Sequence, residues 1–486
     1  SMIHFNLFFI FVFIISIQFS LSLQFDPTNY IPIYASYVFR HGDRTALWPL
    51  DPAYETDEWD NMVGNRSTGQ LTQMGLQQAY SKGKTFYNNL SNQDDTSLNL
   101  LPTSYNFSTV QFRATGVDRT LMTGYGILAS IFDGNDSAAI PNNSQPVPIH
   151  AVLKTDDSLL RPYDMCQKLE DLHNSLDDIP DLWAEYEQRK DILDEISDKI
   201  GTDCTGPSTV QSALYDPLTC DHSHGYLPMD VTEDEYSQVV DMFNIVESYE
   251  FSTASPYYQL YSCNFLQELY SHIETLFVDE APTADAHFYF AHDSTLMAFR
   301  AGLGITPEKV PEYVAHLGYE VLRQSTTPFR PSWVTDRVSM KGTNMADFYI
   351  RLVFGDNSDS YDGITFSSPF IDEYVKSLGG AGETLPEGYY RLDHFMQYIE
   401  TQVWDEDKFN EQCGNLEDNE GMKWYWGFII GIAIAGVVIS AGFFIRHCIE
   451  QKKYAKMDNY FKLSRGSVDG IMHDQSAHED ISPLVE

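Results

Sequence analysis

An apolar run that ends at a cluster of charged residues constrains this chain more than any other feature. Residues 30–39 are rich in aromatic and β-branched side chains and predict a buried strand. Arg-His-Gly-Asp-Arg follows directly at 40–44. Ligands of open α/β sheets bind beyond the carboxyl ends of the strands, so we expect Arg40, His41 and Arg44 to face a binding crevice.

The residue types in this cluster suit a phosphoryl group. Arginine offers a planar fork that matches phosphate oxygens, and histidine can act as a nucleophile or as an acid and base. Average residue usage gives the five-residue string a chance of about one in ten thousand in a chain of this length. We therefore interpret it as a functional motif.

Two further predicted strands end at residues of the same kinds. Residues 109–112 predict a strand that ends at Arg113, and residues 285–291 predict one that leads into His292 and Asp293. If these strands are parallel to the first, all of their ends lie at one edge of the sheet.

Together these segments resemble the histidine acid phosphatases, the second branch of the histidine phosphatase superfamily, and in particular their membrane-bound lysosomal and prostatic-type members. Four motifs carry the resemblance in order and spacing. They are Arg-His-Gly-Asp-Arg at 40–44, Gln-Leu-Thr-Gln-Met-Gly at 70–75, Phe-Arg-Ala-Thr-Gly-Val-Asp-Arg-Thr-Leu-Met at 112–122 and Phe-Ala-His-Asp-Ser-Thr at 290–295.

The resemblance implies an α/β fold with a doubly wound, mostly parallel sheet flanked by helices, and a helical cap inserted into it. It implies hydrolysis of small phosphate monoesters through a phosphohistidine, without a metal or another cofactor. The roles carried over are the nucleophile for His41, the proton donor for Asp293, and binding of the substrate phosphate for Arg40, Arg44, Arg113 and His292.

Other functions on the same fold stay open. Phytase and lysophosphatidate phosphatase activity are alternatives because cap residues decide the substrate, and the sequence does not identify them. A catalytically inactive membrane receptor or adhesion protein is the alternative outside enzymes. It has no chemical need for an intact His41, His292 and Asp293, so we prefer the enzyme.

Composition excludes one class of partner. The 486 residues include 70 acidic and 30 basic side chains, a formal net charge of −40, while 43% of residues are hydrophobic. Such a charge excludes nucleic-acid binding through the general surface. The hydrophobic content fits a globular protein with membrane segments.

The two ends of the chain predict a type I single-pass membrane protein. The apolar stretch from Ile3 to Leu23 predicts a signal peptide, with an uncleaved anchor as the alternative because the usual basic residues are missing. Residues 424–445 contain no charge and are long enough to cross a bilayer, and basic residues follow them. The catalytic domain would then be luminal or extracellular, at the lysosome, endosome or plasma membrane. The resemblance also admits a homodimer.

We divide the chain by these patterns. Acidic amphipathic stretches replace strand-like runs after residue 155, which predicts the helical cap. The predicted parts are a signal peptide (1–22), a discontinuous α/β phosphatase domain (23–155 and 280–413), a cap (156–279), a linker (414–423), a transmembrane helix (424–445) and a cytoplasmic tail (446–486). N-glycosylation is predicted at Asn65, Asn89, Asn106, Asn135 and Asn142.

Five cysteines precede the predicted membrane helix, so they cannot all pair within one chain. The resemblance implies a disulfide between Cys166 and Cys413. The family partner of Cys220 has no counterpart here, and Cys263 or Cys204 remains as a substitute. Cys-Asp-His-Ser-His at 220–224 matches no zinc-site spacing, so we predict no metal there.

Overall fold

The computed structural model describes residues 30–50, 68–91, 100–102, 104–132, 145–253, 255, 258–278, 284–324, 340–356, 364–378, 385–414 and 452. The chain divides into two compact units, residues 1–415 and 416–486. The first unit contains all of the described residues except Lys452.

One eight-stranded sheet forms the centre of the first unit. Its strands are β1 (Tyr30–Arg40), β2 (Val110–Thr115), β3 (His150–Val152), β4 (Ala286–Ala291), β5 (His316–Gln324), β6 (Phe348–Gly355), β7 (Ile364–Thr365) and β8 (Tyr389–Arg391). Their order is β3-β2-β4-β1-β5-β6-β7, and β8 pairs with β6. The three strands predicted to end at the site are confirmed as β1, β2 and β4.

The sheet is mixed, which corrects the prediction of a mostly parallel one. β1, β2, β3 and β4 pair in parallel, whereas the other pairs are antiparallel, so three of the seven pairs formed by the described residues are parallel. The segment before β5 returns to the carboxyl end of β1, where the amide of Val314 donates to the carbonyl of His41. β5 therefore starts at this edge and runs away from it.

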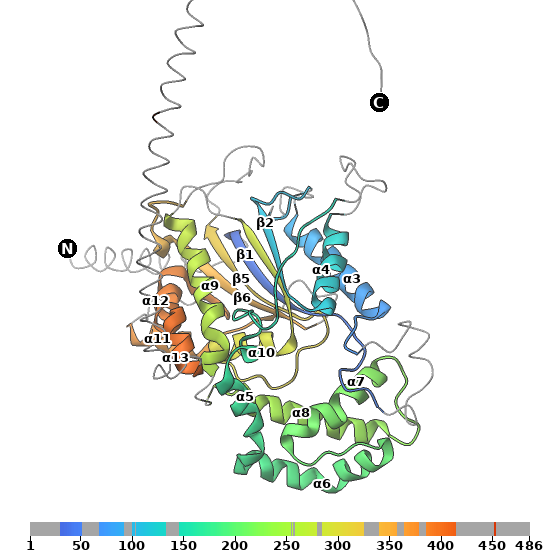
Figure 1. The fold of residues 1–486 in the computed structure, drawn as a ribbon. Helices are drawn as coiled ribbons and strands as arrows, with labels where there is room; N and C mark the ends of the chain where they lie inside the picture. Colours follow the sequence, from blue (N-terminus) through green and yellow to red (C-terminus); the bar gives the residue numbers. More distant parts are fainter. Residues whose placement is uncertain are drawn as a thin grey trace, which may run out of the picture. The chain divides into compact units, whose positions relative to one another are not determined.

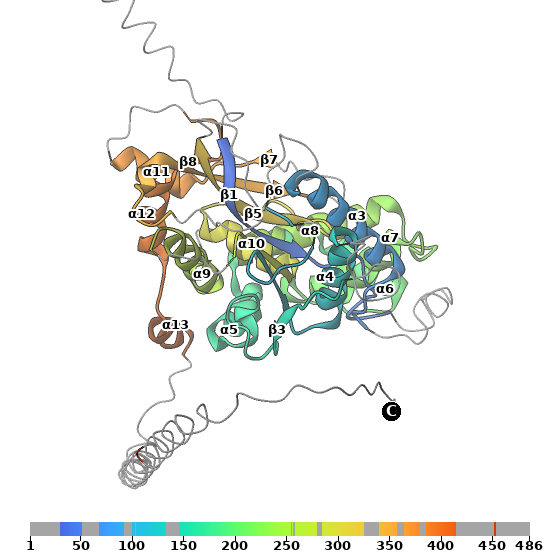
Figure 2. The same ribbon diagram turned by 90° about the horizontal axis from the view of Figure 1, so that it is seen from above.

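The helices of the described residues are α3 (Gln73–Leu90), α4 (Asp118–Ile131), α5 (Gln167–Asn174), α6 (Pro180–Ile200), α7 (Asp216–Ser223), α8 (Glu233–Glu250), α9 (Tyr258–Val278), α10 (Asp293–Gly302), α11 (Pro369–Ser377), α12 (Leu392–Gln402) and α13 (Glu406–Cys413). Some of them cover both faces of the sheet. Short 3-10 helices are Pro162–Asp164, Leu176–Asp178, Pro207–Thr209 and Met345–Asp347, and Gln211–Tyr215 is a π-helix. α3 and α4 lie on one side of the sheet, and α9 and α12 lie on the other (Figure 1 and Figure 2).

Successive side chains of each strand point to opposite faces of the sheet, so the apolar core forms two layers. In β1, Tyr34 and Val38 pack with α9, α10 and α12, whereas Tyr37 and Phe39 point to α3 and α4. β4 follows the same rule. Side chains of a strand point alternately to its two faces, and a strand buried on both faces is therefore apolar throughout.

A third apolar cluster joins the helices between β3 and β4. The described residues of this segment form α5 to α9 and contain no strand. α6 and α8 pack through residues such as Tyr186 and Phe243. The first turns of α9 belong to this cluster, while its later turns, from Phe265 to Phe277, pack on the sheet. α9 thus connects the helical segment to the sheet (Figure 1).

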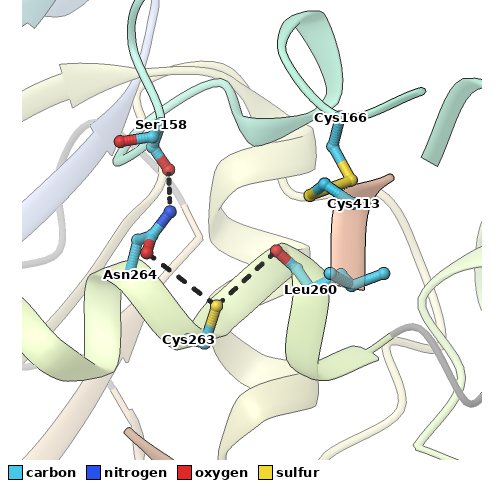
Figure 3. Close-up of a disulfide and its surroundings, with 6 residues drawn as sticks. All are labelled: Ser158, Cys166, Leu260, Cys263, Asn264 and Cys413. Carbon is cyan, nitrogen blue, oxygen red and sulfur yellow. Dashed lines mark hydrogen bonds between the residues drawn. A yellow bond between two sulfur atoms is a disulfide. The ribbon is translucent and has the colours of Figure 1, made fainter. Parts of the chain in front are cut away.

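The implied disulfide between Cys166 and Cys413 is present and joins the start of α5 to the end of α13 (Figure 3). The suggested bond of Cys220 to Cys263 or Cys204 is wrong, because all three are buried free thiols. Their surroundings differ. Cys204 lies near the hydroxyl of Tyr186, Cys220 lies near Arg44, and Cys263 faces a backbone carbonyl of its own helix.

Several predicted features lie outside the described residues: the signal peptide, the transmembrane helix, nearly all of the linker and tail, and the sequons at Asn65, Asn135 and Asn142. Of the other two sequons, Asn106 is exposed, and Asn89 is partly buried in α3. No helix in the described part of the chain has the length and apolar character needed to span a membrane.

The disulfide predicts a stability difference. It closes a loop with a sequence separation of 247 residues, and loss of a native disulfide typically costs about 2–5 kcal/mol. We expect Cys413→Ala to lower the free energy of unfolding in urea by that amount. Cys263→Ala, which removes a buried sulfur but no cross-link, should cost about 1 kcal/mol. Equal losses in the two variants would contradict a structural role for the bond.

Candidate active site

The carboxyl ends of three adjacent parallel strands form the candidate site. β1 ends at Arg40, which pairs in register with Ala291 at the end of β4, and β2 ends beside β4 at Thr115. His41 and His292 therefore follow neighbouring strands, and their ring centroids lie 5.6 Å apart. The sheet brings the two histidines together as the sequence predicted.

His41 is held as a neutral imidazole with one nitrogen free. Its side chain is buried, and Nδ1 lies 2.8 Å from the carbonyl oxygen of Gly42. A carbonyl only accepts, so Nδ1 donates and Nε2 keeps its lone pair. Burial lowers the pKa of His41 well below its usual value, and the nearby charges of Arg119, Arg40 and Arg44 lower it further.

The first turn of α3 supports the loop that carries His41. Thr72 caps α3 by accepting from the amide of Gly75, and its own amide donates to the carbonyl of Asp43. A Cβ on Gly42 would lie 2.4 Å from the carbonyl oxygen of Gly75. The motif at 70–75 thus provides the cap and the close backbone contact that the motif at 40–44 requires.

The segment that leads into β5 covers the other side of the loop that carries His41. The Tyr313 ring lies 4.4 Å from the guanidinium carbon of Arg40, a cation–π contact. Val314 has a φ of 55°, in the left-handed region that a β-branched residue rarely adopts. Such strain costs about 1–3 kcal/mol. It accompanies the hydrogen bond from the Val314 amide to the carbonyl of His41.

Arg40 and Arg44 are both buried and each pairs with an acid. Nη2 of Arg40 lies 2.8 Å from Oδ2 of Asp293. Nη2 of Arg44 lies 2.7 Å from Oδ1 of Asp216, the first residue of α7. Asp216 also accepts from the amides of Leu47 and Trp48. The helical segment therefore fixes Arg44 and the loop behind it.

Two arginines that the sequence analysis missed complete the site. Nη2 of Arg119 lies 3.3 Å from Nδ1 of His292, and Nη1 of Arg161 lies 2.9 Å from Nε2 of the same ring. Burial and the charge of Arg44 lower the pKa of Arg119 to about 10. Burial, Arg119 and Arg161 lower the pKa of His292 well below its usual value. Arg119 lies inside the motif at 112–122. Its position in the first turn of a predicted helix that follows a strand could have identified it as a site residue from the sequence.

Arg113 occupies a different position from the one predicted. Nη2 of Arg113 lies 2.7 Å from Oδ1 of the buried Asp157. Arg113 is not among the charged groups that most lower the pKa of His41 and His292. β2 continues for two residues beyond Arg113, so the edge of the sheet falls at Thr115. Arg119, rather than Arg113, is therefore in a position to contact a phosphate at this edge of the sheet.

Asp293 opens α10 beside Arg40. Its Oδ1 accepts from the amide of Ser294 at 2.8 Å. Burial raises the pKa of Asp293, but Arg40 and Arg44, the Ser294 amide and Arg119 lower it by more, so the net pKa is below its usual value. Without a ligand this carboxyl is therefore ionised and paired with Arg40.

The residues at 220–224 contact three different partners. The sulfur of Cys220 lies 3.6 Å from Nη1 of Arg44, Nε2 of His222 lies 2.9 Å from a carboxylate oxygen of Glu233, and Nε2 of His224 lies 2.6 Å from Oδ2 of Asp43. His224 and Cys220 therefore hold the motif at 40–44 from the side of α7.

The arrangement suits a tetrahedral anion. Arg40, Arg44, Arg119 and Arg161 surround two neutral imidazoles, and the α4 and α10 N-termini lie at the same edge. Guanidiniums and helix N-termini both bind phosphate oxygens. A free imidazole nitrogen and a carboxyl beside this anion supply a nucleophile and a proton-transfer group.

Comparisons with known proteins agree with this chemistry. The model of the histidine phosphatase superfamily (branch 2) matches residues 33–355. Lysosomal acid phosphatase from Homo sapiens is 28% identical over 309 residues, which cover 61% of this chain and 68% of that protein. Prostatic acid phosphatase from Homo sapiens is 28% identical over 298 residues, or 58% and 72% of the two chains. Hafnia alvei phytase in complex with tartrate shares the fold, with a TM-score of 0.52 at 13% identity over 78% of this chain and 98% of that one.

Arg119 and Arg113 give a matched test of the site. We expect Arg119→Ala to weaken binding of inorganic phosphate by roughly ten- to 150-fold, because a hydrogen bond to a charged group contributes about 1.5–3 kcal/mol. Arg113→Ala should weaken phosphate binding less than Arg119→Ala does, because Arg113 pairs with Asp157 and not with the groups around His41 and His292; its main effect should be a loss of stability, since the buried Asp157 is left unpaired. Calorimetric titration of both variants checks this, and the reverse ranking would contradict the assignment.

The lowered pKa of His41 predicts its protonation state in acid. An ordinary histidine titrates near pH 6.5, but unliganded His41 should remain neutral, with its proton on Nδ1, at pH values where an ordinary histidine already binds a second proton. The unfolded chain binds a proton in this range and the folded protein does not, so this residue makes the protein less stable as pH falls.

Nitrogen NMR of histidine-labelled protein measures this state, and His41→Asn identifies the signal. Two protonated ring nitrogens at pH 6 would contradict the prediction. Bound phosphate should move the titration upward, because a dianion favours the charged ring.

Proposed function

The chain belongs to branch 2 of the histidine phosphatase superfamily, and on that basis we propose that it is an acid phosphatase that hydrolyses phosphate monoesters through a phosphohistidine. One observation carries the proposal. The free Nε2 of His41 lies in a buried ring of guanidiniums, with the carboxyl of Asp293 beside them. The acid phosphatases of lysosomal and prostatic type, which resemble this chain, support the same reading.

The reaction proceeds in two steps. Nε2 of His41 attacks phosphorus as the bond to the ester oxygen breaks, and Asp293 gives its proton to that oxygen, so an alcohol leaves. Water then attacks phosphorus, Asp293 takes the proton of the water, the bond to Nε2 breaks and phosphate leaves. Arg40, Arg44, Arg119 and His292 hold the phosphoryl oxygens. The three guanidiniums stabilise the charge of the transition state, so the scheme requires no metal.

Binding of the substrate prepares Asp293 for its role. In the unliganded site Arg40 holds this carboxyl ionised at 2.8 Å. A dianionic phosphoryl group competes for Arg40 and adds negative charge nearby, and both effects raise the pKa of Asp293. The proton donor therefore forms when the substrate arrives, and an acidic medium favours it.

The other activities predicted from the sequence have less support. Likeness to the phytase structures is below 25% identity and supports the fold alone. A lysophosphatidate phosphatase would share the catalytic residues and differ in the groups that contact the alcohol. An inactive receptor would have no use for the free Nε2 and the paired Asp293.

We further propose a cleaved signal peptide, a helical cap over residues 156–279 within an α/β domain of residues 23–155 and 280–413, and a type I membrane helix at 424–445. A lysosomal or other luminal site for the catalytic domain agrees with the lysosomal relatives. A homodimer is part of the same proposal.

Glycosidase digestion should lower the apparent mass, and microsomes should protect residues 23–413 from protease. A protease-sensitive catalytic domain without glycan would contradict this topology.

Hydrolysis by the purified full-length protein tests the enzyme directly. We expect release of phosphate from p-nitrophenyl phosphate and from alkyl phosphates at pH 5 in the presence of EDTA. His41→Ala should abolish release. Activity that disappears with EDTA and returns with a divalent cation would contradict the proposed chemistry.

The proposed role of Asp293 predicts that the loss of rate on its replacement depends on the leaving group. Loss of a general acid typically costs about 10²- to 10⁴-fold in rate. We expect Asp293→Asn to lose this factor for alkyl phosphates, whose alkoxide needs a proton, and much less for p-nitrophenyl phosphate. The ratio of kcat/KM for the two substrates checks this. An equal loss for both would contradict a proton-donor role.

A further inference from the structure

Arg161 has no role in the two-step scheme, yet its guanidinium lies against a residue that holds the phosphoryl oxygens. Nη1 of Arg161 lies 2.9 Å from Nε2 of His292, whose side chain is buried. Arg161 directly precedes the 3-10 helix Pro162–Asp164, in the segment between β3 and β4, and its own side chain is only 13% exposed. A contact this close between two buried side chains restricts the protonation state of the imidazole.

Two neighbours hold the guanidinium of Arg161 in this direction. Its Nε pairs with the carboxylate of Asp164, and its guanidinium carbon lies 4.8 Å from the centre of the Tyr163 ring. The hydroxyl of Tyr163 lies 3.3 Å from Oγ of Ser294, the residue after Asp293. A charge-assisted hydrogen bond and a cation–π contact therefore fix Arg161 on both sides.

The hydrogen-bonding capacity of the two groups decides which ring nitrogen carries the proton. A guanidinium has only N–H donors, whereas a neutral imidazole has one N–H group and one acceptor nitrogen. His292 is neutral because burial, and then the charges of Arg119 and Arg161, lower its pKa. With Nη1 of Arg161 at 2.9 Å, Nε2 is the acceptor and the proton lies on Nδ1. The hydroxyl of Thr115, 3.1 Å from Nε2, can also donate to that nitrogen.

The contact on the other side of the ring gives this proton a use. Nη2 of Arg119 lies 3.3 Å from Nδ1 of His292. With the proton on Nδ1, two donors face each other there, which is unfavourable until an acceptor lies between them. A phosphoryl oxygen is such an acceptor, and hydrogen bonds to an ionised acceptor are the strong ones. Arg119 and His292 thus present a pair of donors to one oxygen of the substrate.

We propose that Arg161 is a positioning residue that fixes the tautomer of His292. By donating to Nε2, it holds the only proton of the ring on Nδ1, from which the ring donates to a phosphoryl oxygen. In the opposite tautomer Nδ1 would direct a lone pair at the anion and repel it. This inference rests on the proposed acid phosphatase function and explains how a neutral His292 binds the phosphoryl group.

Loss of Arg161 should reverse the tautomer, because the remaining neighbours favour the opposite one. Arg119 can then donate to Nδ1, while Thr115 can accept from Nε2 and pass its own proton to Oγ1 of Thr120, 2.8 Å away. Nitrogen NMR of the full-length histidine-labelled protein without phosphate reports the proton on each ring nitrogen, and His292→Asn identifies the signal. We expect a protonated Nδ1 in the wild type and a protonated Nε2 in Arg161→Leu.

Affinity for inorganic phosphate is the second readout. A lost hydrogen bond to a charged group corresponds to roughly ten- to 150-fold in affinity, and we expect a loss of this size in Arg161→Leu. Arg161→Lys retains the charge and a donor and should restore part of the affinity. Calorimetric titration of the full-length variants measures these differences.

Thr115→Val separates the tautomer from other effects of Arg161. When it is added to Arg161→Leu, it removes the acceptor that draws the proton to Nε2. The double variant should therefore bind phosphate more tightly than Arg161→Leu, although it has lost one more polar contact. A role of Arg161 in packing, or through its charge alone, predicts no such gain.

A proton on Nε2 of His292 in the unliganded wild-type protein would overturn the proposal, whether or not the variants fold. So would a proton that stays on Nδ1 in Arg161→Leu, or a double variant that binds phosphate no better than Arg161→Leu. These measurements require no turnover. Failure of the wild-type protein to hydrolyse any phosphate monoester would overturn the acid phosphatase function instead.

Discussion

The hydrogen bond from Nδ1 of His41 to the carbonyl of Gly42 determines what the site can do. It places the only proton of a neutral ring on the side away from the substrate and leaves Nε2 free. Burial and the surrounding arginines lower the pKa of the ring, so that His41 can act as a nucleophile under acidic conditions. The same arginines attract the dianion that the ring attacks. One set of charges therefore both activates the nucleophile and binds its target.

This concentration of positive charge is stable because acids from several elements balance it. Arg40 pairs with Asp293 of α10, Arg44 with Asp216 of α7, and Arg113 with Asp157. A buried ion pair is seldom a source of net stability, but removal of one partner leaves a costly isolated charge. The pairs Arg44–Asp216 and Arg113–Asp157 therefore fix the segment between β3 and β4 to the sheet in one arrangement.

The sequence predicted the parts of this site that depend on local pattern. β1 and β4 are apolar runs that stop at charged residues, so His41, His292 and Asp293 could be placed at a sheet edge. Arg113 was misplaced because β2 runs two residues beyond it, to Thr115, within the usual uncertainty of a predicted strand end. The arginine that contacts His292 from this side is Arg119, in the first turn of the helix that follows the strand. The antiparallel half of the sheet depends on the return of the chain to His41 before β5, which no local pattern encodes. Asp216 looks like an ordinary acid of an amphipathic helix, and only the tertiary packing pairs it with Arg44.

A covalent phosphohistidine at His41 is the central claim, and rapid quenching of the reaction at pH 5 with a phosphorus-labelled ester tests it most directly. The account predicts a labelled protein that is stable to alkali and labile to acid, formed within the first turnover and absent from His41→Ala. A phosphoenzyme that forms at the normal rate in His41→Ala, or one that is labile to alkali, would contradict it.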